Sequence, residues 1–110
     1  DLDGLPFISL LPEHDIYSQI ERAFADCNAS LNVVVKTQMM ESVSSFLRHG
    51  AGAGLLDPLT AKRYAGQGLV VRPFVPSITQ KIALVLPRDR LRSVVLEEFV
   101  AVLRSALAAA

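Results

Sequence analysis

Three polar residues that follow expected β-strands have side chains suited to binding a small charged molecule. Thr37 and Gln38 come after an expected strand at 33–36 that begins with three valines, and Asp57 comes after a pair of leucines. In open α/β sheets, ligands bind beyond the carboxyl ends of the strands, where helix N-termini present N–H groups without partners. A hydroxyl beside such N–H groups suits a ligand carboxylate, and an aspartate suits a ligand ammonium.

Each of these residues also has a plainer structural interpretation. Thr37 suits the N-cap of a helix that begins after it, and Asp57 suits the same position because Pro58 follows it directly. Gln38 and Met39 would be ordinary first-turn residues of the helix after Thr37. The capping and ligand-binding roles are compatible for Thr37, and the sequence leaves both open for Asp57.

Alternating apolar strands and amphipathic helices must position these residues. The strands are expected at 6–11, 33–36, 55–56, 69–75 and 82–86, and the helices at 15–27, 38–49, 59–65 and from about 93. Asp15 is expected to cap the first helix, and Gly50 to end the second. This alternation predicts an α/β layered fold with helices on both faces of a largely parallel, mixed sheet.

The end of the first strand lies next to the expected binding edge. Ser9, Leu10 and Leu11 end this strand. They are candidates for a wall of the binding site, although a buried strand end explains them equally well.

Composition limits both the size of the fold and its partners. The 110 residues make one small domain or a piece of a larger one, and the chain begins with Asp1, so we expect an excised fragment. Eleven basic residues balance eleven acidic ones, which argues against direct DNA binding by this segment. No apolar run approaches a membrane span. A content of 51% hydrophobic residues predicts burial against a partner or missing sequence.

The sequence gives little support for a catalytic, nucleotide-binding or metal-binding site. The glycine series 50–54 lacks the Lys-Ser or Lys-Thr of a phosphate-binding loop and precedes a strand. No serine lies in a Gly-x-Ser-x-Gly turn, and His14 and His49 have no ligands at metal spacing. Cys27, on the apolar side of its expected helix, is predicted to be a packing residue. We therefore expect no enzyme, cofactor or metal.

The order of these segments is similar to a known family. The series DLDGLPFISL, VVVKTQ, RHGAGAGLLDPLTAKRY, GLVVRPF and IALVLPRDR, followed by an amphipathic helix, resembles the effector-binding domain of LysR-type transcriptional regulators. The resemblance covers nearly the whole chain. It corresponds to the second lobe of a two-lobed, periplasmic-binding-protein-like domain, at 1–87, and a terminal helix, at 88–110, that would return to the first lobe.

The resemblance implies a sensor function. A small-molecule effector would bind between two lobes and shift an oligomeric, cytoplasmic regulator that contacts DNA through a helix-turn-helix outside this segment. The cleft residues would be Ser9, Leu10, Thr37, Gln38, Met39 and Asp57. Thr37 for a carboxylate and Asp57 for an amine suggest an amino-acid or opine-like effector. The alternatives are a fragment of a transport-type solute-binding protein and an oligomerisation module.

Overall fold

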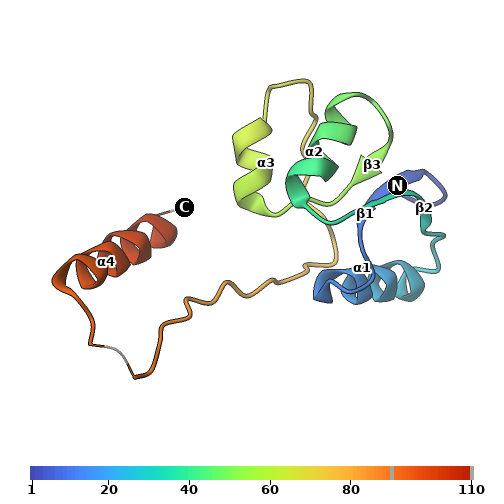
Figure 1. Ribbon diagram of the computed structural model, residues 1–110. Helices are drawn as coiled ribbons and strands as arrows, with labels where there is room; N and C mark the ends of the chain where they lie inside the picture. Colours follow the sequence, from blue (N-terminus) through green and yellow to red (C-terminus); the bar gives the residue numbers. More distant parts are fainter. Residues whose placement is uncertain (90, 110) are drawn as a thin grey trace. The chain divides into compact units, whose positions relative to one another are not determined.

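The computed structural model describes residues 1–89 and 91–109, which form two compact units, Asp1–Gln80 and Lys81–Ala110. The first unit alternates strands and helices, and the second contains one helix (Figure 1). The elements of the first unit are β1 (Pro6–Leu10), α1 (Asp15–Asp26), β2 (Asn32–Thr37), α2 (Met40–Arg48), β3 (Ala53–Gly54) and α3 (Pro58–Tyr64). The second unit contains α4 (Val94–Ala108).

The described strands form one three-stranded sheet in the order β2-β1-β3, and both pairings are parallel. The prediction of a mixed sheet was therefore wrong. The segments 69–75 and 82–86, predicted as strands, are irregular, apart from a single bridge between Ala65 and Leu69. Pro73 and Pro76 bring no N–H to a ladder. A strand also needs a paired neighbour, which local sequence does not supply.

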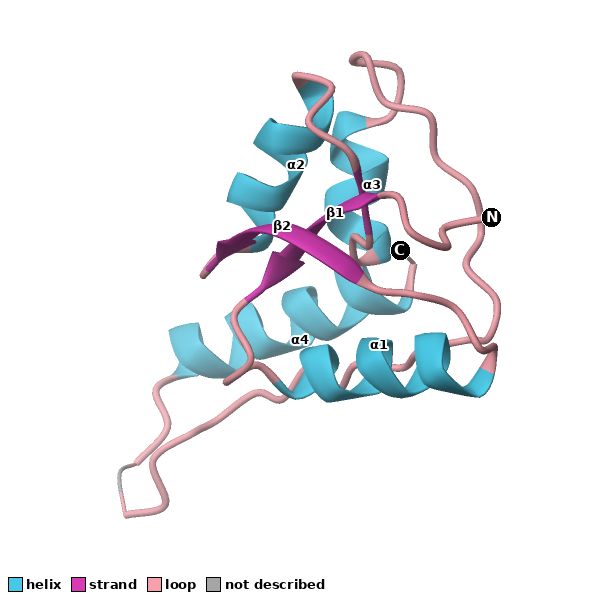
Figure 2. Ribbon diagram, turned by 90° about the vertical axis from the view of Figure 1, so that its right-hand side faces the viewer, coloured by secondary structure: helices cyan, strands magenta, loops and turns pink. Residues whose placement is uncertain are grey.

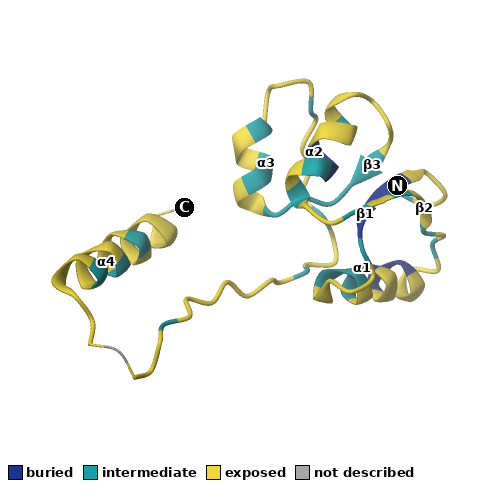
Figure 3. Cartoon of the chain, viewed as in Figure 1, coloured by how far each residue is buried: buried dark blue, intermediate teal, exposed yellow. Residues whose placement is uncertain are grey.

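The core lies on both sides of β1, because successive side chains of a strand point to opposite faces. Phe7 packs with Ile20 and Phe24 of α1, whereas Ile8 packs with Val43 of α2. Figure 2 shows α1 and α2 on opposite sides of the sheet, and Figure 3 shows the buried residues on the same three elements. The predicted helices on both faces are thus confirmed.

A register shift in the pairing of β1 with β2 places Val33 and Val35 on opposite faces of the sheet. Phe7 is paired with Val33, but Ile8 is paired with Val35, so Val34 is an extra residue on β2. Such a bulge changes which way the following side chains point. Val33 accordingly packs against the Phe7 cluster and Val35 against the Ile8 cluster, while Val34 is exposed.

Helix α1 begins at the predicted residue, Asp15, and ends at Asp26, one residue before the predicted end. Its N-cap is His14, which makes no side-chain capping bond, so the assignment of Asp15 as the cap was wrong. Cys27 is exposed at the C-cap, and its prediction as a packing residue was also wrong. The reason is that the helix ends there: Asn28 takes a φ of 54°, which turns the chain away.

Close packing explains the glycines around β3. A Cβ atom on Gly52 would lie 2.3 Å from the carbonyl oxygen of Pro6, and one on Gly54 would lie 3.1 Å from that of Ile8. The strand comprises Ala53 and Gly54, two residues before the predicted position. Gly50 follows the C-cap of α2 with a φ of 75°, as predicted for the residue that ends this helix.

Helix α4 of the second unit begins as predicted. The Ser93 hydroxyl accepts a hydrogen bond of 3.1 Å from the Leu96 N–H, which makes Ser93 the N-cap. None of its described residues is buried, and Val95 and Phe99 are exposed. Among the described residues, no helix combines the length and the hydropathy required to cross a bilayer. The assignment of the terminal helix to a missing first lobe stays a prediction.

Candidate functional site

The predicted binding residues lie at one edge of the sheet. Because all three strands are parallel, their carboxyl ends share this edge, and Leu10 of β1 is paired with Thr37 of β2. The chain enters α2 after Gln38 and Met39, and enters α3 after Asp57. Thr37 and Asp57 are half-buried, whereas Gln38 and Met39 are exposed. The edge therefore presents two helix N-termini and four polar or adaptable side chains.

Thr37 does not cap α2, contrary to one of its two predicted roles. It is the last residue of β2, and its carbonyl oxygen accepts a 3.0 Å hydrogen bond from the Leu11 N–H, which extends the pairing with β1. The N-cap is Met39, whose side chain makes no capping bond. The first-turn N–H groups of α2, at Met40 and Glu41, are of the kind that a helix leaves without an internal acceptor.

Ser9 and Leu10 lie beneath this edge. Ser9 is 2% exposed, and its hydroxyl donates a 2.9 Å hydrogen bond to the carbonyl oxygen of Leu10. Leu10 belongs to the apolar cluster of Ile8 and Val43. Within this unit, both side chains are buried under the edge and are not accessible to a ligand from solvent.

Asp57 is the N-cap of α3, as one of its two interpretations predicted. Its Oδ1 atom accepts a 2.9 Å hydrogen bond from the Thr60 N–H, and its Oδ2 atom accepts a 2.6 Å bond from the Thr60 hydroxyl. An ionised carboxylate offers about four lone-pair sites, and Thr60 occupies two of them. Capping therefore leaves acceptor capacity for a ligand donor.

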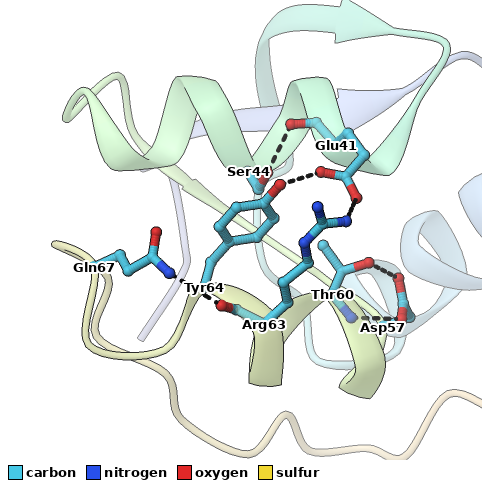
Figure 4. A network of polar contacts seen from close by, with 7 residues as sticks. All are labelled: Glu41, Ser44, Asp57, Thr60, Arg63, Tyr64 and Gln67. Carbon is cyan, nitrogen blue, oxygen red and sulfur yellow. Dashed lines mark hydrogen bonds and ion pairs between the residues drawn. The ribbon is translucent and has the colours of Figure 1, made fainter.

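A polar network beside this edge joins α2 to α3 (Figure 4). Glu41, in the first turn of α2, accepts a 3.1 Å hydrogen bond from the Arg63 guanidinium and another from the Tyr64 hydroxyl. The Arg48 guanidinium lies 5.2 Å from the centre of the Tyr64 ring, within range of a cation–π contact. This network was not predicted from the sequence. The available signal was the seven-residue spacing of Glu41 and Arg48, which places them on one side of α2 about two turns apart.

The Glu41 carboxylate should hold the Tyr64 phenol in its protonated form. The hydrogen bond to Glu41 and partial desolvation raise the pKa of Tyr64 above its ordinary value of 10.0, although Arg63 and Arg48 oppose the rise. Because the folded-state pKa is the higher one, the bond stabilises the fold fully below the ordinary pKa and is lost as pH rises through the raised value. In a Tyr17→Phe background, phenolate absorbance should titrate at lower pH after Glu41→Ala; an unchanged titration would contradict the bond.

Two cavities among the described residues are lined by residues other than the predicted binding residues. One, of about 700 Å³, is lined by Phe24, Ala53, Leu55 and Phe74 among others. The second, of about 470 Å³, lies between α1 and β2. None of the predicted binding residues lines either cavity. The described part of the chain also contains no group of three His, Cys, Asp or Glu side chains that could hold a metal.

Comparison with known proteins identifies relatives over nearly the whole chain. The family model for the LysR substrate binding domain matches residues 1–108. Regulatory protein NocR of Agrobacterium tumefaciens (strain T37) is 30% identical over 109 residues, covering 99% of this chain and 36% of that protein. The transcriptional activator protein LysR of Escherichia coli (strain K12) is 30% identical over 99 residues, covering 90% of this chain and 32% of that protein. The chain thus spans about a third of these relatives. No solved structure gave a significant match.

Proposed function

The chain belongs to the LysR substrate-binding domain family, and from this we propose that it is the second lobe of the effector-binding domain of a transcriptional regulator. The complete regulator acts in the cytoplasm as a homo-oligomer and contacts DNA through a helix-turn-helix outside this segment. A small molecule binds between this lobe and a first lobe. Its binding shifts the regulator because its contacts differ between two arrangements of the lobes.

The observation that supports this proposal is the chemistry gathered at the carboxyl edge of the sheet. The first turn of α2, which follows Thr37 closely in the chain, offers N–H donors for an anionic group. The Asp57 carboxylate has lone pairs left for a cationic group. A ligand that carries both a carboxylate and an ammonium suits the two positions. We therefore propose an amino acid or an opine-like conjugate as the effector.

Gln38 and Met39 complete this proposal as residues of the cleft wall. Both are exposed between β2 and α2, and Met39 is 61% exposed. The amide of Gln38 can donate or accept a hydrogen bond, and the flexible thioether of Met39 can adapt to an apolar part of the ligand. Ser9 and Leu10, buried beneath them, hold the end of β1 in place.

Isothermal calorimetry on the complete two-lobed regulator tests the effector class. The panel comprises basic amino acids, opines, aromatic acids and sulfate. We expect binding of an amino acid or opine, weakened roughly ten- to hundredfold by Asp57→Asn, because hydrogen bonds to charged groups contribute roughly 1.5–3 kcal/mol. Asparagine also caps helices well, so this variant removes the charge and retains α3.

Two controls separate ligand contact from folding. Thr37→Val removes the hydroxyl but keeps the β-branched shape that suits the end of β2. It should weaken only the binding of the ligand carboxylate. Analogues of the bound ligand without the amino group should bind Asp57→Asn and the parent regulator equally. Binding of anionic aromatic acids, with no amino acid or opine bound, would overturn the proposed effector class.

A further inference from the structure

Helix α3 carries Asp57 at its start but has little of its own to hold it in place. It spans seven residues, none of which is buried, and Leu59 is 44% exposed. Isolated helices of this length are unstable in water, and most helices in proteins are held by packing of an apolar face. Leu56, the residue before Asp57, packs against the Ile8 cluster and fixes where α3 starts. The direction of α3, and with it the orientation of its N-cap carboxylate, must therefore depend on other contacts between the helix and the rest of the unit.

The polar network described above supplies these contacts. Glu41 and Arg48 are seven residues apart on α2, so they lie on one side of the helix about two turns apart. Tyr64 reaches both, because its hydroxyl donates to Glu41 while its ring lies beside the Arg48 guanidinium. Arg63 adds the ion pair with Glu41 and lies 5.5 Å from the same ring. We call Glu41, Arg48, Arg63 and Tyr64 the Tyr64 clamp.

The clamp and the candidate ligand groups lie at opposite ends of the same short helix. Asp57 is the N-cap of α3, and Tyr64 is its last residue. On the other side, Glu41 is in the first turn of α2, beside the N–H groups assigned to the ligand carboxylate. A change in how α3 lies on α2 therefore changes the separation between the two charged positions of the site.

We propose that the Tyr64 clamp is the positioning element of the effector site: it sets the distance between the N-terminus of α2 and the Asp57 carboxylate. The side chains of Tyr64 and Glu41 act through Asp57 and do not contact the ligand, although the backbone N–H of Glu41 is one of the donors assigned to the ligand carboxylate. The inference rests on the proposed function, since it assigns a role in the same binding site. It also makes the clamp a determinant of specificity for ligands of one length between carboxylate and ammonium.

The expected effect is moderate, because the clamp is partly solvated. The side chains of Glu41 and Arg63 are 45% and 69% exposed, and exposed ion pairs contribute little by themselves. Tyr64→Phe removes one hydrogen bond but keeps the ring beside Arg48. We expect it to weaken binding about three- to tenfold, the range of one net hydrogen bond.

The test is a double-mutant cycle on the complete regulator, with calorimetry as the readout. The probe is the tightest binder from a panel of basic amino acids and opines. Tyr64→Phe should lower the affinity of the parent regulator for this probe but cause no further loss of affinity in an Asp57→Asn background. Non-additivity is expected of residues that act through one another. The analogue without the amino group should bind both Tyr64 forms equally.

A second pair of variants guards against a purely structural explanation. Arg63→Gln should reproduce the loss, whereas Lys62→Gln removes a charge from the same exposed helix outside the clamp and should leave affinity unchanged. Equal losses from Tyr64→Phe in both backgrounds would show a general structural role and overturn the positioning role, as would unchanged affinity. If no amino acid or opine bound the unmodified regulator, the proposed function would fail first, and this inference with it.

Discussion

Replacing Phe7 with alanine should lower the free energy of unfolding of the first unit by about 3–5 kcal/mol. Phe7 is 1% exposed, and its ring packs edge to face against that of Phe24, with 5.7 Å between the ring centres. The substitution removes the buried area, leaves a cavity beneath α1 and abolishes the aromatic contact. Domains are stable by only about 5–15 kcal/mol, so this loss is a large part of the unit's stability.

Urea denaturation followed by circular dichroism measures this loss on the 110-residue chain. Phe99→Ala in α4 is the matched control, because it makes the same substitution at a residue that is 59% exposed. We expect its effect to stay within about 0.5 kcal/mol, as for most surface substitutions. If the two variants were equally stable, the core would not be centred on β1 as described.

Elements fixed by local chemistry were predictable from the sequence. The Asp57-Pro58 pair indicated the start of α3, Ser93 indicated the start of α4, and Gly50 indicated the end of α2. In each case, one or two residues accept hydrogen bonds from the first N–H groups of the helix or adopt the φ that ends it. Neither effect depends on residues far away in the chain. The amphipathic pattern likewise predicted α1, although the helix ends one residue earlier than predicted.

Elements that depend on distant partners were less predictable. Thr37 was proposed as a cap, but pairing with Leu10 and Leu11 keeps it extended, and α2 begins after Met39. The segment 69–75 has the composition of a strand, yet no ladder forms beyond the bridge to Leu69. Strand pairing joins residues far apart in the chain, so composition alone does not determine it.

The candidate site shows the same division. Parallel strands place their carboxyl ends together, so the expectation that Thr37 and Asp57 share an edge followed from the α/β alternation. The Tyr64 clamp was not predicted, because Glu41 and Tyr64 are brought together only by the packing of α3 on α2. Predicting it required the relative position of two helices, which the periodicity of each helix does not give.

Gly52→Ala should lower the free energy of unfolding by about 3 kcal/mol, at the upper end of the cost of overpacking. The added Cβ atom would lie 2.3 Å from the carbonyl oxygen of Pro6 and 2.9 Å from its carbonyl carbon. These are backbone atoms of the central strand, so they cannot move aside as a flexible side chain does. β3 must instead move away from β1, which weakens its pairing with Phe7 and Ile8.

Gly66→Ala is the control that separates this contact from backbone strain. Gly66 has a φ of 80° and nothing within 4 Å of an added Cβ, so alanine there meets strain without a clash. Its cost should stay near 1 kcal/mol, the low end for a strained φ. Equal destabilisation by the two variants in urea denaturation would contradict the contact with Pro6.

The same substitution should also affect the proposed binding site, because β3 leads directly to Asp57. Only Leu55 and Leu56 separate the strand from the N-cap of α3, and both pack against the core clusters of β1. A displaced β3 therefore moves the Asp57 carboxylate relative to α2, even though Gly52 contacts no ligand. In the complete regulator, Gly52→Ala should lower the affinity for an amino-acid effector more than Gly66→Ala does. Retained affinity in a destabilised variant would contradict this dependence of Asp57 on β3.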